Sequence, residues 1–381
     1  MSPSLLQLFL TFLRLGFISF GGPAMIQYIH QSIVNDKKWL NQDEFTNGLV
    51  ICQSLPGAIV VNTSAYYGYQ LRGLTGMLVS FSAFLLPSFI IMLAFSISYK
   101  ASKDLQIVMS IFKGLEVMVV AIVINACIRF CIDRLKKSIR GYILAGICAG
   151  LLLSGINPLF VIILSAITGL IFYRDATISG TIKPPRHVPM SHIAFHIFVF
   201  CAFYIAIIIS NKEIFELSYT MTKIALMSFG GVYTALPIMY HEVVEAKMWL
   251  SSKVFMDGIA LGQVTPGPVL INATFVGYNI GGILGAFAST FAIFAPGPIL
   301  VSLMIPLFNR VGNSPYFVSS IKGMVVSFAG LLIFVSIKFG IAVHWDMIKA
   351  ILLVSSLLWL AFKNNVIALA VVGTVLSAII F

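Results

Sequence analysis

Charged residues are scarce in this chain. They make up 10% of its 381 residues, and only 13 residues are Asp or Glu. Soluble domains average about 25% charged residues, so this composition excludes an ordinary soluble protein. The chain also lacks a GxxxxGK[ST] loop and a polar domain that could hold a nucleotide, which argues against ATP as the direct energy source.

Clusters of metal ligands are also missing. The five cysteines all fall in apolar segments, and although Cys127 and Cys131 are spaced to share one helix face, no further ligand stands near them. His192 and His196 have the same i, i+4 spacing and are equally isolated. We therefore expect no bound metal, no cofactor and no enzymatic activity, and a membrane enzyme is the weakest alternative.

Hydrophobic residues dominate instead. They account for 59% of the chain, and the mean hydropathy is +1.00. Apolar runs of about 20 residues, the length that crosses a hydrocarbon core of about 30 Å, recur throughout. The sequence predicts an all-α polytopic membrane protein with about 13 transmembrane segments, at residues 5–29, 45–68, 73–97, 106–128, 141–155, 157–173, 192–210, 215–240, 254–279, 282–307, 316–337, 347–361 and 366–381.

The first six segments match the last six. A shift of 209 aligns the SFGG of Ser19–Gly22 with that of Ser228–Gly231, and after one inserted residue a shift of 210 aligns Pro56-Gly57 with Pro266-Gly267. The shift then returns to 209 for the rest of the repeat. Matches that include prolines and intramembrane cations predict an internal duplication.

The segment between the two copies sets their relative orientation. Six crossings return the chain to its starting side, so a seventh crossing turns the second copy upside down. We expect a first repeat at residues 1–173, a linker plus one extra span at 174–214, and a second, inverted repeat at 215–381. Such inverted repeats are typical of secondary transporters that bind substrate near the bilayer midplane.

The net charge of +11 is spread over short loops, which favours a topological explanation over nucleic-acid binding. With 13 crossings, 13 loop Lys and Arg residues, including Lys247 and Lys253, fall on the N-terminal side. The opposite side has seven, namely Lys37, Lys38, Lys100, Lys103, Lys212, Lys338 and Lys349. By the positive-inside rule we expect a cytoplasmic N-terminus and an external C-terminus.

Two related stretches carry the expected binding site, QSLPGAIVVN from Gln53 and QVTPGPVLIN from Gln263. A Pro-Gly pair breaks a membrane helix and frees backbone groups that only protein, water or a ligand can satisfy. The resulting half-helix N-termini favour an anion. The candidate substrate-binding residues are Gly21, Gly22, Gln53, Pro56, Gly57, Asn62, Gly230, Gly231, Gln263, Pro266, Gly267 and Asn272, together with Lys113 and Lys322. Gly73, Gly76, Gly282 and Gly285 are assigned to close helix packing instead.

Four cations lie inside the expected spans as two matched pairs, Arg14 with Lys223 and Lys113 with Lys322. A charge at the bilayer centre costs about 2.5 to 3.5 kcal/mol, so each needs a partner or a function. Arg14 and Lys223 can reach an interface or clamp a neighbouring helix. Lys113 and Lys322 are better placed for anion binding.

Two acids complete the set of candidates. Glu116 stands one turn after Lys113 and should largely neutralise it, whereas the matching position after Lys322 is a valine. We therefore expect Lys322 to be the more available cation, and its neutralisation to abolish anion binding. Glu116 and Asp257 are the proton-coupling candidates. For Asp257, capping of the second broken helix is the alternative.

The sequence resembles the chromate ion transporters in their long form with two homologous halves. The resemblance covers nearly the whole chain and rests on FLRLGFISFGGP from Phe12, QSLPGAIVVN, the second SFGG and FMDGIALGQVTPGPVLINATFVGY from Phe255. It implies outward movement of chromate and hence chromate resistance, sulfate as a tetrahedral mimic, a proton gradient as energy source and a bacterial plasma membrane. The first half reads PGA where the family pattern has PGP.

Three hypotheses follow. The leading one is secondary active transport of an oxyanion by alternating access, with chromate as the cargo and coupling to the proton gradient. The second, within the same fold, makes sulfate or another oxyanion the physiological cargo, because nothing in the residues selects between two tetrahedral dianions. The third is a passive anion channel. A homodimer is compatible with each.

Overall fold

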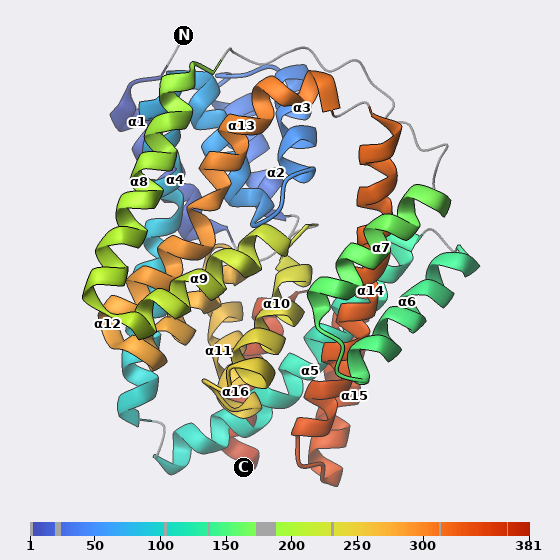
Figure 1. Cartoon of the computed structure of the whole chain (residues 1–381). Helices are drawn as coiled ribbons and strands as arrows, with labels where there is room; N and C mark the ends of the chain where they lie inside the picture. The colour runs from blue at the N-terminus through green and yellow to red at the C-terminus, as the bar shows by residue number, and fades with distance from the viewer. Residues whose placement is uncertain are drawn as a thin grey trace.

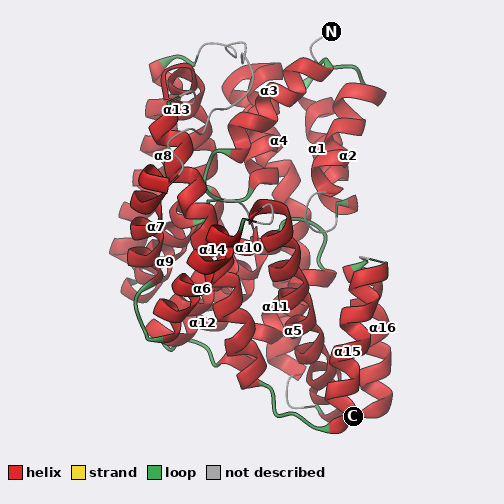
Figure 2. Cartoon of the chain, turned by 90° about the vertical axis from the view of Figure 1, so that its right-hand side faces the viewer, coloured by secondary structure: helices red, strands yellow, loops and turns green. Residues whose placement is uncertain are grey.

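The protein is described by a computed structural model that covers residues 3–19, 24–102, 105–135, 138–172, 188–229, 232–311, 314–363 and 365–381. Every regular element in these ranges is a helix (Figure 2), and the only β-type pairing that they contain is an isolated antiparallel bridge between Pro56 and Phe229. The all-α membrane class predicted from composition is confirmed. Residues 173–187, which hold most of the expected linker, lie outside the described ranges.

Within the described residues, the first half of the chain folds into seven α-helices and one π-helical turn. Figure 1 labels the α-helices. These are α1 Leu5–Ile18, α2 Ala24–His30, η1 Gln31–Asp36, α3 Gln42–Gln53, α4 Ile59–Ser102, α5 Gln106–Leu135, α6 Ile139–Leu153 and α7 Pro158–Phe172.

In the described part of the chain, one helix, α8 Met190–Ser210, stands between the halves. The second half then contains α9 Lys212–Met227, α10 Val232–Tyr240, η2 His241–Ala246, α11 Ser252–Val264, η3 Val269–Ile271, α12 Asn272–Phe294, α13 Pro296–Val311, α14 Pro315–Ala342, α15 Met347–Phe362 and α16 Val366–Ile380. The order of long, short and π-helical elements largely repeats that of the first half.

Local sequence explains where the broken helices begin. Ser4 and Gln7 form a capping box at the start of α1, and Asn41 and Glu44 form another at the start of α3. Ser251 caps α11 through the N–H of Val254. These caps satisfy N–H groups that the first turn of a helix leaves free.

The broken segments are hairpins, because residues on either side of each break touch. Tyr67 Oη donates a hydrogen bond of 2.5 Å to the carbonyl of Phe45, so α3 and the start of α4 run side by side in opposite directions. An ion pair of 2.7 Å between Lys223 and Glu242 joins α9 to η2 in the same way. Each hairpin therefore turns back at its break and does not continue across the hydrocarbon core.

The hairpins change the count of crossings. With a rise of 1.5 Å per residue, the 14 residues of α1 extend about 21 Å, less than a hydrocarbon core of about 30 Å. Five helical stretches in the described chain are long and apolar enough to span a membrane. The prediction of 13 full spans is therefore not confirmed, since apolar runs such as 45–68 are pairs of half-length helices.

Two sharp corners start the long spans. Gly73 and Gly282 adopt φ values of 65° and 60°, which non-glycine residues rarely adopt, and they turn α4 and α12 back on themselves. At each corner the backbones pass closely, with Gly76 against Gly68. Close packing is thus confirmed for Gly76 and, at the second corner, for Gly285, but it is wrong for Gly73 and Gly282, which serve the turn.

The hairpins also change which loops share an end of the molecule. Lys338 on α14 lies 2.7 Å from Glu245, just before the loop that holds Lys247 and Lys253. The expected placement of that loop and Lys338 on opposite sides is therefore wrong, because a hairpin leaves on the side where it entered.

For the same reason Lys37 and Lys38 lie at the N-terminal end. They precede Phe45, which bonds Tyr67, and Arg72 a few residues later donates to the carbonyl of Pro3. Lys37 and Lys38 thus lie on the N-terminal side, and Lys247 and Lys253 do not.

The two halves interlock through their outer helices. α7 of the first half packs on α14 of the second, where a methyl group on Gly323 would come within 2.1 Å of the Ser165 carbonyl. α16 of the second half packs on α5 of the first, where Gly114 faces the Ser377 side chain. The glycine after each intramembrane lysine is therefore a packing position.

Candidate functional site at four helix breaks

The four breaks meet in the middle of the molecule, each against a break from the other half. The N–H of Gly57 donates to the carbonyl of Ser228 at 2.9 Å, and the N–H of Gly267 donates to the carbonyl of Ser19 at 2.6 Å. Pro56 and Phe229 form the antiparallel bridge beside the first contact. Backbone groups freed by the Pro-Gly pairs are thus satisfied across the boundary between the halves.

Both Pro-Gly turns need glycine for their backbone shape. Gly57 has a φ of 93° and Gly267 a φ of 107°. Their surroundings differ, since a methyl group on Gly57 would meet nothing nearer than 3.9 Å, whereas one on Gly267 would lie 1.8 Å from Ser88 Oγ on α4. The second turn is therefore pressed against the long helix of the first half.

The two asparagines differ in their bonding. Asn62 Nδ2 donates to the carbonyl of Pro56 at 3.0 Å and so closes the first break from within. Asn272 is fully buried, and neither of its amide atoms has a hydrogen-bond partner among the described residues. Ser19 Oγ and Ser88 Oγ, also fully buried, are in the same condition.

The other candidates from the breaks are placed less centrally or lie outside the description. Pro56 and Pro266 are buried at the turns, but Gln53 is exposed and Gln263 is half-buried. Gly21, Gly22, Gly230 and Gly231 fall outside the described residues.

The intramembrane lysines are not brought to the breaks by any contact that the structure records. Lys113 and Lys322 are exposed, and neither pairs with a described acid within 4 Å. The expected pairing of Lys113 with Glu116 is wrong, because the Glu116 side chain turns inward and its nearest cation is Lys253, at 3.9 Å.

The matched cations Arg14 and Lys223 differ, because among the described residues only Lys223 clamps a neighbouring element. Lys223 bonds Glu242, whereas Arg14 is exposed and has no described ion pair. At a shift of 210, the position that matches Glu242 is Ser32, so the first half lacks the acid that would pair with Arg14.

The two proton-coupling candidates lie on helices that pack against each other, Asp257 on α11 and Glu116 on α5. Asp257 is 2% exposed, and its Oδ2 accepts a hydrogen bond of 2.6 Å from Tyr99 at the end of α4. Its Oδ1 has no partner in the described chain. The alternative that Asp257 caps its helix is wrong, because Ser251 is the cap.

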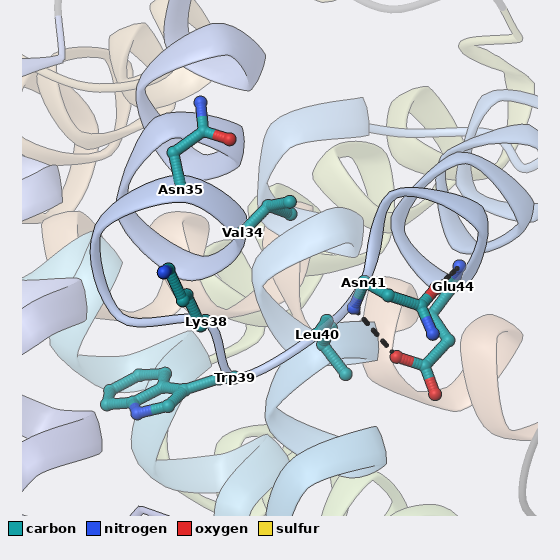
Figure 3. A pocket seen from close by; sticks show the side chains of 7 residues that line it. All are labelled: Val34, Asn35, Lys38, Trp39, Leu40, Asn41 and Glu44. Atoms are coloured by element: carbon teal, nitrogen blue, oxygen red, sulfur yellow. Dashed lines mark hydrogen bonds between the residues drawn. The ribbon is translucent and has the colours of Figure 1, made fainter.

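A surface pocket of about 580 Å³ opens away from the breaks (Figure 3). It lies between the end of η1 and the start of α3, where Asn35, Lys38 and Trp39 line it beside the capping pair Asn41 and Glu44. The 12 residues of α3, about 18 Å of helix, separate it from the first break. Its position therefore suits a membrane-surface loop, for which Trp is typical.

Three contributors were not predicted from the sequence. Ser19 opens the matched SFGG motif, but that motif points to its glycines, and Ser88 and Tyr99 carry no motif, because serine and tyrosine in apolar helices are common. One signal was present for Ser88, which directly follows Pro87, at the position that matches Pro296-Gly297 in the second half.

The fold and the hydrogen bonds among the four breaks define a polytopic helical membrane protein. Each of its two halves contributes two broken helical hairpins to one buried centre. Within that class the chain belongs to the chromate transporter family, whose model matches residues 6–170 and 215–379.

Relatives cover most of the chain. An uncharacterized transporter of Methanocaldococcus jannaschii is 38% identical over 100% of this chain and 95% of its own. The chromate transport protein of Cupriavidus metallidurans is 27% identical over 99% of this chain and 93% of its own, and that of Pseudomonas aeruginosa is 26% identical over 86% and 79%. No solved structure matches the chain.

Proposed function

We propose that this protein is a secondary transporter that moves chromate out of the cell across the plasma membrane. The observation that carries the proposal is the pair of reciprocal hydrogen bonds, from Gly57 to Ser228 and from Gly267 to Ser19, which place two Pro-Gly breaks and buried polar groups between the halves. The chromate transport proteins among the relatives support chromate as the cargo. Sulfate is the alternative cargo, since it has the same shape and charge.

The proposed mechanism is alternating access by two inverted repeats. The boundary between the halves passes through the centre, where every recorded bond between the breaks joins one half to the other. Rocking of one half against the other would exchange these bonds and open the centre to each side in turn. The repeats would be residues 1–173 and 215–381, with the N-terminus in the cytoplasm and the C-terminus outside.

The lysines have a different proposed role from the breaks. Lys113 and Lys322 are exposed, so we assign them to raising the local concentration of anions near the pathway. Direct contact with the anion falls to the buried breaks, where Ser19, Ser88 and Asn272 hold side-chain polar atoms without described partners.

Proton coupling is assigned to Asp257 and Glu116. Both carboxyl groups are more than nine-tenths buried, and the helices that carry them, α11 and α5, pack against each other. The bond from Tyr99 to Asp257 joins the long helix of the first half to a hairpin of the second, so a change in protonation at Asp257 acts on the boundary between the halves.

Uptake into proteoliposomes tests the function. Because efflux from the cell corresponds to uptake into vesicles with inverted protein, labelled chromate is offered with and without an imposed pH gradient, and excess sulfate is the competitor. Saturable accumulation that depends on the gradient supports a coupled transporter. Flux that does not saturate and ignores the gradient indicates a passive anion channel.

Asp257→Asn separates coupling from transport. Asn keeps an oxygen that can accept from Tyr99 but cannot take up a proton, so exchange of labelled for unlabelled anion should persist while gradient-driven accumulation is lost. Asn47→Asp, at the matching position in the first half, is the control and should leave the gradient dependence unchanged. Full coupling in Asp257→Asn would remove this residue from the proposal.

A further inference from the structure

The second break gathers buried polar atoms that have no hydrogen-bond partner among the described residues. The atoms are Ser19 Oγ, Ser88 Oγ, Asn272 Nδ2 and Asn272 Oδ1. All three side chains are 0% exposed. Buried polar atoms without partners are rare in proteins, and each one needs an explanation.

Residues from three separate elements surround this break. Ser19 ends α1, and its carbonyl accepts the bond from the Gly267 N–H. Ser88 on α4 touches Gly267 closely enough that no side chain fits at that glycine. Asn272 opens α12 five residues beyond the same glycine, and its Oδ1 faces Gly258 on α11. Two of the three side chains come from the first half, so the set exists only when the halves are together.

The first break has no such set, although the repeats match position by position. Ser228, which matches Ser19, donates its hydroxyl to the carbonyl of Ile224. Asn62, which matches Asn272, donates to Pro56. Gly297, which matches Ser88, has no side chain to offer. Each polar group is therefore satisfied or absent at the first break and unpartnered at the second.

Ordinary helix packing does not account for the difference. A serine in an apolar helix usually returns its hydroxyl to a carbonyl of the preceding turn, as Ser96 on the same helix does with Met92. Leaving the hydroxyl of Ser88 unbonded costs free energy that a bound ligand would recover.

We infer that the second break is the subsite that binds the oxyanion, with Ser19, Ser88 and Asn272 as its hydrogen-bond donors, while the first break closes the centre without binding it. This rests on the proposed function. Two hydroxyls and one amide offer four donor hydrogens, and a tetrahedral dianion presents only acceptors, whose bonds to neutral donors are charge-assisted. Asn272 Oδ1, the one atom of the set that can only accept, suits a water or a protonated anion oxygen.

The test is equilibrium binding of labelled chromate and of labelled sulfate to the purified full-length protein. Ser88→Ala should raise the Kd for chromate by about tenfold or more, the usual effect of losing one hydrogen bond to a charged group. Ser80→Ala is the matched control, because Ser80 is a fully buried serine on the same helix whose hydroxyl also has no described partner. Its Kd should equal that of the unmodified protein.

A second measurement distinguishes a binding role from a structural one. Without anion, Ser88→Ala should melt at the same or a higher temperature, since it removes a buried polar atom that has no partner. Added chromate should raise the Tm of the unmodified protein and of Ser80→Ala, but much less that of Ser88→Ala.

Each outcome decides between the proposals. Chromate binding with an unchanged Kd in Ser88→Ala and Ser19→Ala would overturn the subsite and leave the transport function standing. Absence of binding of either anion to the unmodified, folded protein would overturn both. A rise in Kd for Ser80→Ala equal to that for Ser88→Ala would also overturn the subsite, because any loss of a buried hydroxyl would then have the same effect.

Discussion

The two halves of the protein share one fold and differ in where they place polar groups. In the first half the break is closed by its own residues, since Asn62 bonds Pro56. In the second half Asn272 is left unbonded, and Asp257 and Glu242 stand where the first half has Asn47 and Ser32. Duplication therefore kept the hairpins that build the centre and let the side chains of the two copies specialise.

The difference has a simple physical origin. Two copies that meet at one centre form two contacts of the same backbone type, and each contact is enough to satisfy the freed N–H group of its glycine. Once the backbone is satisfied, the side chains around one turn are free to serve a ligand. The comparison predicts that matched substitutions in the two halves will have unequal effects.

The largest inequality is expected at the glycines of the two turns. Gly57→Ala introduces only backbone strain, about 1 to 2 kcal/mol for a left-handed conformation, because no atom lies within 3.9 Å of the new methyl group. Gly267→Ala adds a collision with Ser88 Oγ at 1.8 Å. We expect Gly267→Ala to abolish transport and lower the Tm well below that of Gly57→Ala, measured by uptake and thermal unfolding in detergent.

A double variant separates the collision from the strain. Ser88→Gly copies the residue that the second half has at this position, and it removes the colliding hydroxyl. The Tm of the pair Gly267→Ala and Ser88→Gly should return to that of Gly57→Ala, while anion transport stays low because the donor is gone. A Tm for Gly57→Ala below that of Gly267→Ala would reverse the comparison.

The next effect concerns the hairpin clamp that only the second half has. Glu242→Ala leaves Lys223 without its partner, and breaking a buried pair costs roughly 3 to 5 kcal/mol. Lys223 is partly exposed, so the lower end of that range is expected, measured as a drop in thermal stability. Arg14→Gln, at the position that matches Lys223, should change stability by less than about 0.5 kcal/mol.

Replacing both members of the pair provides the control. Lys223→Met with Glu242→Leu should recover most of the stability that Glu242→Ala loses, since no charge is left unpaired. An equal loss for Arg14→Gln and Glu242→Ala would mean that Arg14 has a partner of similar strength.

How far the sequence leads can be traced to particular residues. The Pro-Gly pairs at Pro56 and Pro266 predict the breaks, and the matched spacing of the two halves predicts the duplication. An apolar run does not tell whether the chain continues or turns back at a break. That information lies in a contact such as Tyr67 with Phe45, which neither composition nor length encodes.

The site illustrates the same limit. The asparagines were predicted because they stand in a repeated motif, but the loss of bonding at Asn272 depends on packing between the halves. Tyr99 and Asp257 are 158 residues apart, and no local pattern connects them. The two lysines were predicted as site residues because an intramembrane charge is conspicuous in a sequence, but the fold leaves both exposed and away from the recorded contacts of the breaks.

The smallest effect is therefore predicted for the most conspicuous residue. Lys322 is exposed and has no described contact with the breaks, so we expect its charge to contribute no more than an exposed ion pair does, about 0 to 1 kcal/mol. Lys322→Gln should slow chromate uptake by up to about fivefold at low ionic strength and hardly at all at high salt, because ions screen exposed charges. Lys113→Gln is the matched variant and should behave alike. Complete loss of chromate binding in Lys322→Gln, with the fold intact, would instead support the expectation from the sequence and place this lysine in contact with the anion, in an arrangement of the two halves other than the one described.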